Sequence, residues 1–133
     1  NIGKRLRRVE TLMHSGDDLP RVTPATLVPD VIYEISRKKL GVAAVVENGG
    51  KLAGIITDGD LRRLMLKRKN EALTLTAADC MSRNPVTIGK DELAASALRL
   101  MEQRRITAVL VVDDAQIVLG VVHLHDLWTL QLF

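Results

Sequence analysis

The sequence predicts an α/β (α+β) fold made of two βαββα repeats packed as a pseudo-two-fold pair. First, 47% of the 133 residues are apolar but only 2% are aromatic, so Val, Ile, Leu, Ala and Met must build the core. Second, short β-branched runs alternate with segments of helical periodicity. Third, the pattern returns after 66 positions, as from Asp60 to Asp126. So long a spacing indicates two copies of a small domain, which we expect to pack on each other.

Composition and charge narrow the class of protein. The single cysteine, Cys80, excludes an internal disulfide and fits a reducing compartment. No apolar run approaches the roughly 20 residues of a membrane span, so we expect a cytoplasmic protein without a membrane partner. The net charge of +3 comes from short basic clusters with no aromatic residues between them. This argues against nucleic-acid binding and favours a solvated face or one that meets a phosphorylated small molecule.

The first repeat has a strong pattern from residue 19 onward. An extended piece over 19–22 precedes a helix that Thr26 is expected to cap. Two strands, 42–46 and 52–56, flank an Asn-Gly-Gly turn and predict a hairpin. A second helix begins at Asp58, and residues 68–76, whose sequence has no strong pattern, are expected to serve as the connector. The apolar residues expected to face inward are Leu27, Val31, Ile32 and Ile35 on the first helix, and Leu61, Leu64 and Met65 on the second.

The second repeat follows the first in the same register. Strand 42–46 corresponds to 108–112, and Gly54 corresponds to Gly120. Each repeat opens with a short segment that contains a methionine: residues 78–81 resemble 11–13. The segment over 9–13 is expected to form one helical turn.

The candidate site is the stretch Gly54–Arg63, an apolar strand that runs into a helix. A helix N-terminus offers free N–H groups and a positive dipole end to an anion such as phosphate. Thr57 can donate a hydrogen bond to that phosphate, and ionised Asp60 can accept from the two hydroxyls of a ribose. The alternative is that Thr57 and Asp58 only cap the helix.

The second copy of this stretch has His123 in place of the hydroxyl but keeps the aspartate, Asp126. An imidazole predicts a pH-dependent phosphate contact, and the alternative is an ordinary polar residue at a helix start. His123 and His125 are two positions apart with no third ligand, so no metal site is expected. Cys80 has no activating partner and His14 falls in a polar loop, so no catalytic residues are expected.

These features resemble a known family. Two βαββα units that each close with Gly-x-x-(Thr/Ser)-x-x-Asp look like a tandem cystathionine-β-synthase (CBS) domain pair, a Bateman module, over about 9–130. Gly54–Arg63, Val9–Pro20 and Leu124–Leu127 are similar to one group, the SIS–CBS arabinose-5-phosphate isomerases of lipopolysaccharide and capsule synthesis. Residues 2–6 resemble the end of the segment that joins their isomerase domain to the CBS pair.

The resemblance implies a division of labour. Residues 1–8 would end a linker from a missing N-terminal SIS isomerase domain, 9–69 and 78–133 would be the two CBS domains, and 70–77 would connect them. The SIS domain carries the interconversion of D-arabinose 5-phosphate and D-ribulose 5-phosphate. This chain would therefore be a regulatory piece and not itself an enzyme.

The resemblance also implies a ligand and its contacts. The hydroxyl of the motif would bind phosphate and the aspartate would bind ribose, while main chain near the first hairpin strand and the extended piece would hold the base. No cofactor is required; the effector would be a pathway product such as CMP-Kdo, or CMP, or an adenine nucleotide (AMP or ATP). The implied ligand-binding residues are Thr57, Asp58, Gly59, Asp60, Val22, Thr23, Leu40, Gly41 and Val42, with His123, Asp126, Thr87, Ile88, Ile106, Thr107 and Ala108 in the second repeat.

Two alternatives remain open. The chain could be an oligomerisation and interaction module with empty clefts, since CBS pairs often form homo-oligomers through their helices. Leu64, Met65, Leu130 and Leu132 would then be the contact residues. It could also be an AMP or ATP sensor of another parent protein.

Overall fold

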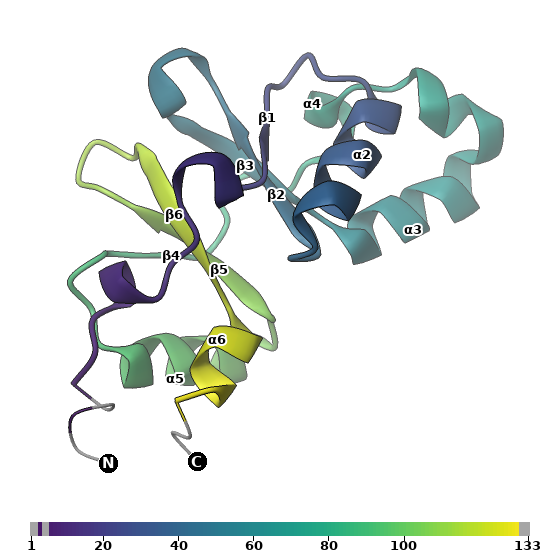
Figure 1. Cartoon of the computed structure of the whole chain (residues 1–133). Helices are drawn as coiled ribbons and strands as arrows, with labels where there is room; N and C mark the ends of the chain where they lie inside the picture. The colour runs from purple at the N-terminus through teal and green to yellow at the C-terminus, as the bar shows by residue number, and fades with distance from the viewer. Residues whose placement is uncertain (1–2, 4–5, 131–133) are drawn as a thin grey trace. The chain divides into compact units, whose positions relative to one another are not determined.

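Each half of the chain folds into strand, helix, strand, strand and helix, as the duplication predicts (Figure 1). The computed structural model describes residue 3 and residues 6–130. The chain divides into two compact units. The first-repeat unit is Asp17–Pro85, and the second-repeat unit joins the described residues up to Gly16 to those from Val86 onward.

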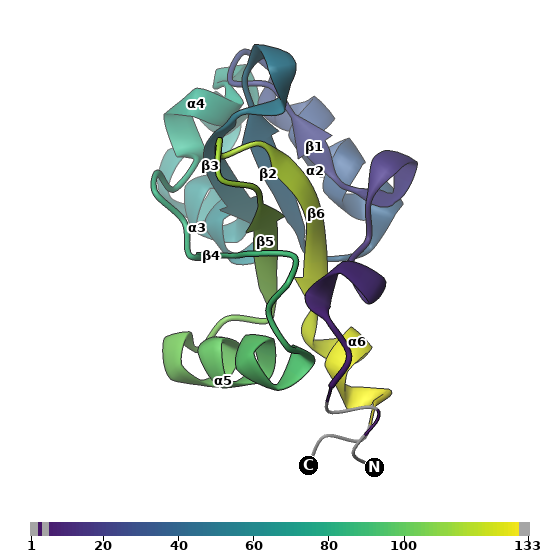
Figure 2. The ribbon, with the colours of Figure 1, turned by 90° about the vertical axis from the view of Figure 1, so that its left-hand side faces the viewer.

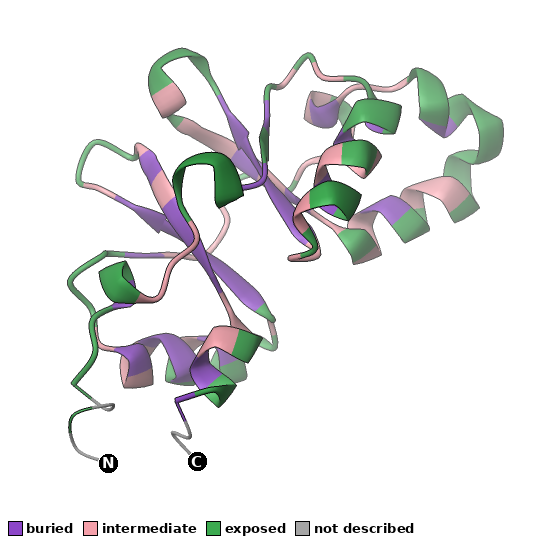
Figure 3. Cartoon of the chain, in the orientation of Figure 1, coloured by how far each residue is buried: buried purple, intermediate pink, exposed green. Residues whose placement is uncertain are grey.

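The first-repeat unit is built on a three-stranded sheet in the order β1-β2-β3. β1 runs parallel to β2, and β2 and β3 form the expected antiparallel hairpin. Every residue of β2 is buried, because the strand is central and apolar on both faces (Figure 3). The elements are β1 Arg21–Val22, α2 Val28–Lys38, β2 Val42–Val46, β3 Leu52–Thr57, α3 Asp58–Arg68 and α4 Ala77–Cys80.

The second-repeat unit has the same topology in the order β4-β5-β6. Even the irregularity repeats: the register shift between Val45 and Val46 recurs between Val111 and Val112. The 66-residue duplication predicted from the sequence is therefore confirmed strand by strand. The elements are β4 Thr87–Ile88, α5 Ala94–Arg104, β5 Ala108–Val112, β6 Val118–His123 and α6 Leu124–Trp128.

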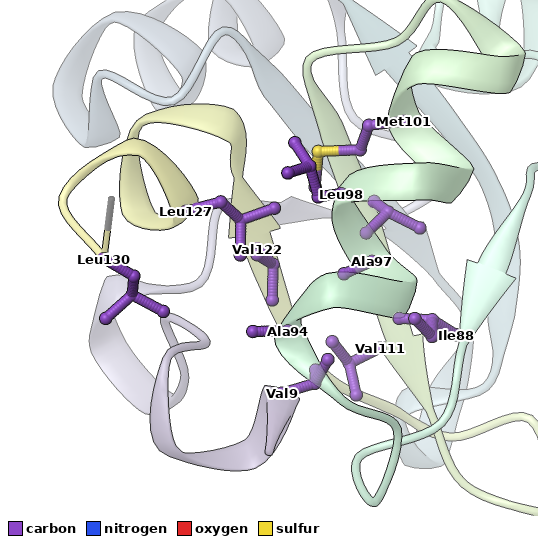
Figure 4. Close-up of a cluster of buried hydrophobic side chains, with 11 residues drawn as sticks. Val9, Ile88, Ala94, Ala97, Leu98, Met101, Val111, Val122, Leu127 and Leu130 are labelled. Carbon is purple, nitrogen blue, oxygen red and sulfur yellow. The ribbon is translucent and has the colours of Figure 1, made fainter. Parts of the chain in front are cut away.

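Each unit has its own aliphatic core. In the first-repeat unit, Val31, Ile35 and Leu61 pack with Val45 and Ile56. In the second-repeat unit, α5 and α6 close over β5 and β6, and Leu127 reaches from α6 toward Val122 and Leu98 (Figure 4). Burial of this kind stabilises by about 25 cal/mol per Å² of apolar surface. Both clusters consist of the aliphatic residue types expected from the composition.

The short segment that opens each repeat packs in the unit of the other repeat. In the first repeat it comprises the 3-10 turn Val9–Thr11 and the residues that lead to His14, which forms an antiparallel bridge with Val121 of β6. Figure 2 shows this purple segment alongside β6. In the first-repeat unit Ser82 forms the same bridge with Ile55. These bridges cover the open edges of β6 and β3, which would otherwise expose unpaired backbone groups. Each compact unit thus combines the main part of one repeat with the opening segment of the other.

Two local predictions were wrong. Thr26 does not cap α2: Leu27 holds the N-cap position without a side-chain bond, and the Thr26 hydroxyl instead accepts from the N–H of Thr23 at 3.0 Å. Leu27 does not face inward either, since 48% of it is exposed. In the connector, Lys69–Thr74 forms a 3-10 helix and Ala72 is fully buried. A single small buried residue is too weak a periodic signal to be detected in sequence.

Candidate functional site

The Gly54–Arg63 stretch folds as predicted, with β3 ending at Thr57 and α3 beginning at Asp58. Thr57 and Asp60 form a reciprocal capping box. The Thr57 Oγ1 accepts from the Asp60 N–H at 3.1 Å, and the Thr57 N–H donates to Asp60 Oδ2 at 2.9 Å. Capping uses the hydroxyl oxygen as an acceptor and leaves its hydrogen to be donated. The capping alternative is therefore realised in a geometry that still offers a donor.

Arg63 adds a positive charge at the same helix end. Its Nη2 donates to Asp60 Oδ1 at 2.8 Å, while 71% of its side chain is exposed. Gly59 leaves room for this arrangement, since a Cβ there would lie 3.2 Å from Arg63 Nη1. An exposed pair of this kind contributes at most about 1 kcal/mol. An incoming anion can therefore draw Arg63 away at small cost.

The start of β2 lies against the motif. The carbonyl of Gly41 accepts from the Asp58 N–H at 2.9 Å, and Val42 is paired with Thr57. Gly41 has a φ of +73°, a conformation that glycine adopts without strain. The structure thus brings Gly41 and Val42, after Leu40, next to the turn that holds Thr57 and Asp60.

The extended pieces lie further along the sheet. Val22 is paired with Val45, three positions beyond Val42, or roughly 10 Å along the strand. Thr23 follows it and donates its N–H to Thr26. Within the first-repeat unit, Val22 and Thr23 therefore do not share the turn. Thr87 and Ile88 are displaced in the same way, beside Leu110 and Val111.

In the second-repeat unit the motif also forms a capping box, with His123 at the N-cap of α6. The His123 N–H donates to Asp126 Oδ2 at 2.8 Å, and its Nδ1 accepts from the His125 N–H at 3.1 Å. Thr107 follows Ile106 and its carbonyl accepts from the Leu124 N–H at 2.8 Å, while Ala108 is paired with His123. The strand start and the motif adjoin here as in the first repeat.

Burial lowers the pKa of His123; the charges of His125 and His14 lower it further and Asp126 opposes them. The ring is therefore neutral at pH 7, since its ordinary pKa is about 6.5. The His123 ring is thus neutral, and its Nδ1 already accepts a hydrogen bond. This agrees better with the alternative prediction, a polar residue at a helix start, than with a charged ligand for phosphate.

His14 is the residue that the sequence reasoning missed. Its Nε2 lies 3.0 Å from both carboxylate oxygens of Asp126, although the two residues are 112 positions apart. The one available signal was the resemblance between the two methionine segments. Met13 and Met81 each rest on the strand glycine of the other repeat, Gly120 and Gly54, which places the following residues, His14 and Ser82, at the edges of the sheets.

Other reactive groups are engaged in structural bonds. The Cys80 thiol contacts the carbonyls of Thr76 and Ala77, and burial, with the charges of Asp60 and Asp79, raises its pKa. A thiol of this kind stays protonated and is a poor nucleophile. Over residues 3 and 6–130, no three His, Cys, Asp or Glu side chains are grouped to hold a metal ion. Within the same residues no helix is long and apolar enough to cross a bilayer.

The chain is similar to several known proteins. It is 41% identical over 127 residues to arabinose 5-phosphate isomerase KdsD of Yersinia pestis and 40% identical over 129 residues to KdsD of Francisella tularensis. These matches cover 93% and 97% of this chain but only 37% and 39% of the relatives, so the chain spans well under half of their length.

Solved structures share the fold. The CBS domain pair of MJ0100 in complex with 5′-methylthioadenosine and S-adenosyl-L-methionine has a TM-score of 0.80 at 25% identity, covering 95% of this chain and 96% of that one. CBSX2 in complex with AMP has a TM-score of 0.82 at 23% identity, covering 94% and 96%. The CBS-domain family model matches residues 9–67 and 77–127. The chain therefore belongs to the CBS-domain family and carries two copies of that domain.

Proposed function

We propose that this chain is the regulatory CBS pair of an arabinose-5-phosphate isomerase in Kdo and lipopolysaccharide synthesis. About 40% identity over nearly the whole chain supports this parent, and the coverage of 37–39% of the relatives leaves room for a separate catalytic SIS domain. In this proposal the chain regulates the isomerisation, and the SIS domain catalyses it.

The regulatory signal is a nucleotide or nucleotide sugar bound at Thr57 and Asp60. The observation that carries this proposal is the capping box at the start of α3, a helix of 11 residues. It offers the Thr57 hydroxyl hydrogen and the positive end of the helix dipole to phosphate, and the Asp60 carboxylate to a ribose diol. Arg63, released from Asp60, adds a positive charge for phosphate or for the carboxylate of a sugar acid.

Two classes of effector fit these groups. CMP-Kdo and CMP are the feedback candidates because CMP-Kdo is a product of the parent's own pathway. Adenine compounds are supported by MJ0100, whose CBS pair is in complex with 5′-methylthioadenosine and S-adenosyl-L-methionine. Both classes share the ribose diol and therefore require Asp60, while the base distinguishes them.

Asp60→Ala tests the site by calorimetric titration with CMP-Kdo, CMP, AMP and ATP. We expect the affinity for the bound nucleotide to fall at least tenfold, since a lost hydrogen bond to a charged group is worth about 1.5–3 kcal/mol. Asp79→Ala is the matched control, because Asp79 closes an equivalent capping box with Thr76 at the start of α4. The proposal fails if no nucleotide binds to the wild-type chain or if both variants lose affinity equally.

An interaction role is favoured by one observation. Leu66 on α3 is 81% exposed, more than any other large apolar residue described. The contact residues predicted from the sequence are less exposed than Leu66. Leu130 is buried in the core of the second-repeat unit, and Leu64 and Met65 pack partly buried against the core of the first-repeat unit. Leu132 lies outside the described residues. We propose that Leu66 contributes to a homo-oligomer.

Leu66→Glu tests the interaction role by sedimentation velocity. We expect the variant to sediment as a smaller species than the wild type while its nucleotide affinity stays within about twofold, because a charge in an apolar contact costs several kcal/mol. Lys67→Glu on the same helix is the control for added negative charge. Equal sedimentation of wild type and Leu66→Glu would remove Leu66 from any interface.

A further inference from the structure

The carboxylates of the two motifs are engaged by different kinds of partner. Asp60 receives one bond from the Thr57 N–H and one from Arg63. Asp126 receives the equivalent bond from the His123 N–H, but both of its oxygens also lie 3.0 Å from His14 Nε2. One aspartate is thus held by a residue of its own helix and the other by His14, which is 112 positions away.

Arg63 and His14 differ in how easily a ligand could displace them from the aspartate. Arg63 is mostly exposed and belongs to the same helix as Asp60, so a rotamer change frees the carboxylate. His14 is only 33% exposed, and its main chain is fixed to β6. The His14 N–H donates to the Val121 carbonyl at 2.8 Å, and the Val121 N–H donates back at 3.0 Å. A ligand would have to displace an anchored side chain to reach Asp126.

We propose that His14 and Asp126 form a clamp that fastens the segment Val9–His14 to the second repeat and withdraws Asp126 from ligand binding. The chain then offers one nucleotide site, at Thr57 and Asp60; this second part rests on the proposed function. The second copy of the motif thereby serves as a structural lock on the segment Val9–His14. The two repeats therefore have different roles, one binding the effector and the other holding this segment.

The contrast with the first-repeat unit supports a clamp and not a generic feature of the fold. Ser82 stands where His14 stands, and its main chain makes the same pair of bonds with Ile55, at 2.9 and 3.0 Å. The backbone bridge therefore occurs in both units, while Asp60 takes its side-chain bond from Arg63. The second-repeat unit differs in that the His14 imidazole is hydrogen-bonded to the Asp126 carboxylate.

His14→Ser copies the first repeat and removes only the clamp. Hydrogen exchange measured by NMR on the amides of His14 and Val121 reports directly on the docking of the segment. We expect both amides to exchange about fivefold faster in His14→Ser, which corresponds to the loss of one side-chain hydrogen bond, worth about 1 kcal/mol. Ser82→Ala, at the matched position, should leave the Ser82 and Ile55 amides unchanged. Unchanged exchange at His14 and Val121 in His14→Ser overturns the clamp.

A second arm tests the withdrawal of Asp126. Asp126→Asn keeps an oxygen for the His123 N–H, and Asp60→Asn does the same for Thr57. In calorimetric titration of the wild type with CMP and AMP, we expect one nucleotide to bind per chain. Asp60→Asn should reduce the affinity for that nucleotide at least tenfold, whereas Asp126→Asn should leave the affinity unchanged within twofold. Equal losses, or two nucleotides per chain, overturn the single site. If no nucleotide binds to the wild type, the proposed function and the single site both fall, while the exchange measurement still decides the clamp.

Discussion

Replacing Gly120 with alanine is expected to destabilise the chain by about 1–3 kcal/mol, because the new Cβ has no space. It would lie 2.7 Å from the carbonyl oxygen of His14 and 2.8 Å from the sulfur of Met13. The carbonyl cannot retreat without breaking its bond with the Val121 N–H. The segment Val9–His14 must therefore separate from β6, or the strand must bend. Urea denaturation followed by circular dichroism measures the loss.

Gly89 provides the control for this substitution. A Cβ there meets nothing within 4 Å, so Gly89→Ala should change the free energy of unfolding by less than about 0.5 kcal/mol. Gly54→Ala should behave like Gly120→Ala, because its Cβ would lie 2.7 Å from the Ser82 carbonyl oxygen. Shortening Met13 to alanine in the Gly120→Ala background should restore only part of the loss, since the carbonyl contact remains. Wild-type stability of Gly120→Ala would show that the segment does not lie against this glycine.

The opening segment of each repeat packs on the other repeat, and this explains why part of the fold could not be predicted from the sequence. Helices with a strong period, such as 94–104, and short β-branched runs, such as 42–46, are encoded locally, and the 66-residue spacing fixes their order. The segment Val9–His14 has only one 3-10 turn and no period. Its partner, Val121, is more than a hundred positions away, so nothing local in the sequence indicates which repeat it joins.

The candidate site also has a part that could be predicted from the sequence and a part that could not. Thr57 and Asp60 could be identified because a capping box is a local pattern of side chains on one turn. The contacts of Gly41 and Thr107 are made by main-chain carbonyls, which every residue possesses, so side-chain identity carries little information about them. The bond between His14 and Asp126 depends on which strand edge the segment covers. That choice is made by tertiary packing and not by the residues adjacent to either partner.

Leu127→Ala tests how far the second motif depends on the core beneath it. Leu127 is fully buried, and its loss should cost about 2–5 kcal/mol through lost burial and the cavity left behind. α6 has only five residues, too few to be stable without tertiary packing. We therefore expect the variant to lose the capping box of Asp126 as well, seen as faster amide exchange at His123 and His125. Leu61→Ala, at the equivalent position of the 11-residue α3, should cost stability but keep exchange at Asp60 slow, because a longer helix retains its first turn. A loss below about 1 kcal/mol in Leu127→Ala would mean that α6 is held by its own hydrogen bonds, and that the clamp does not depend on this core.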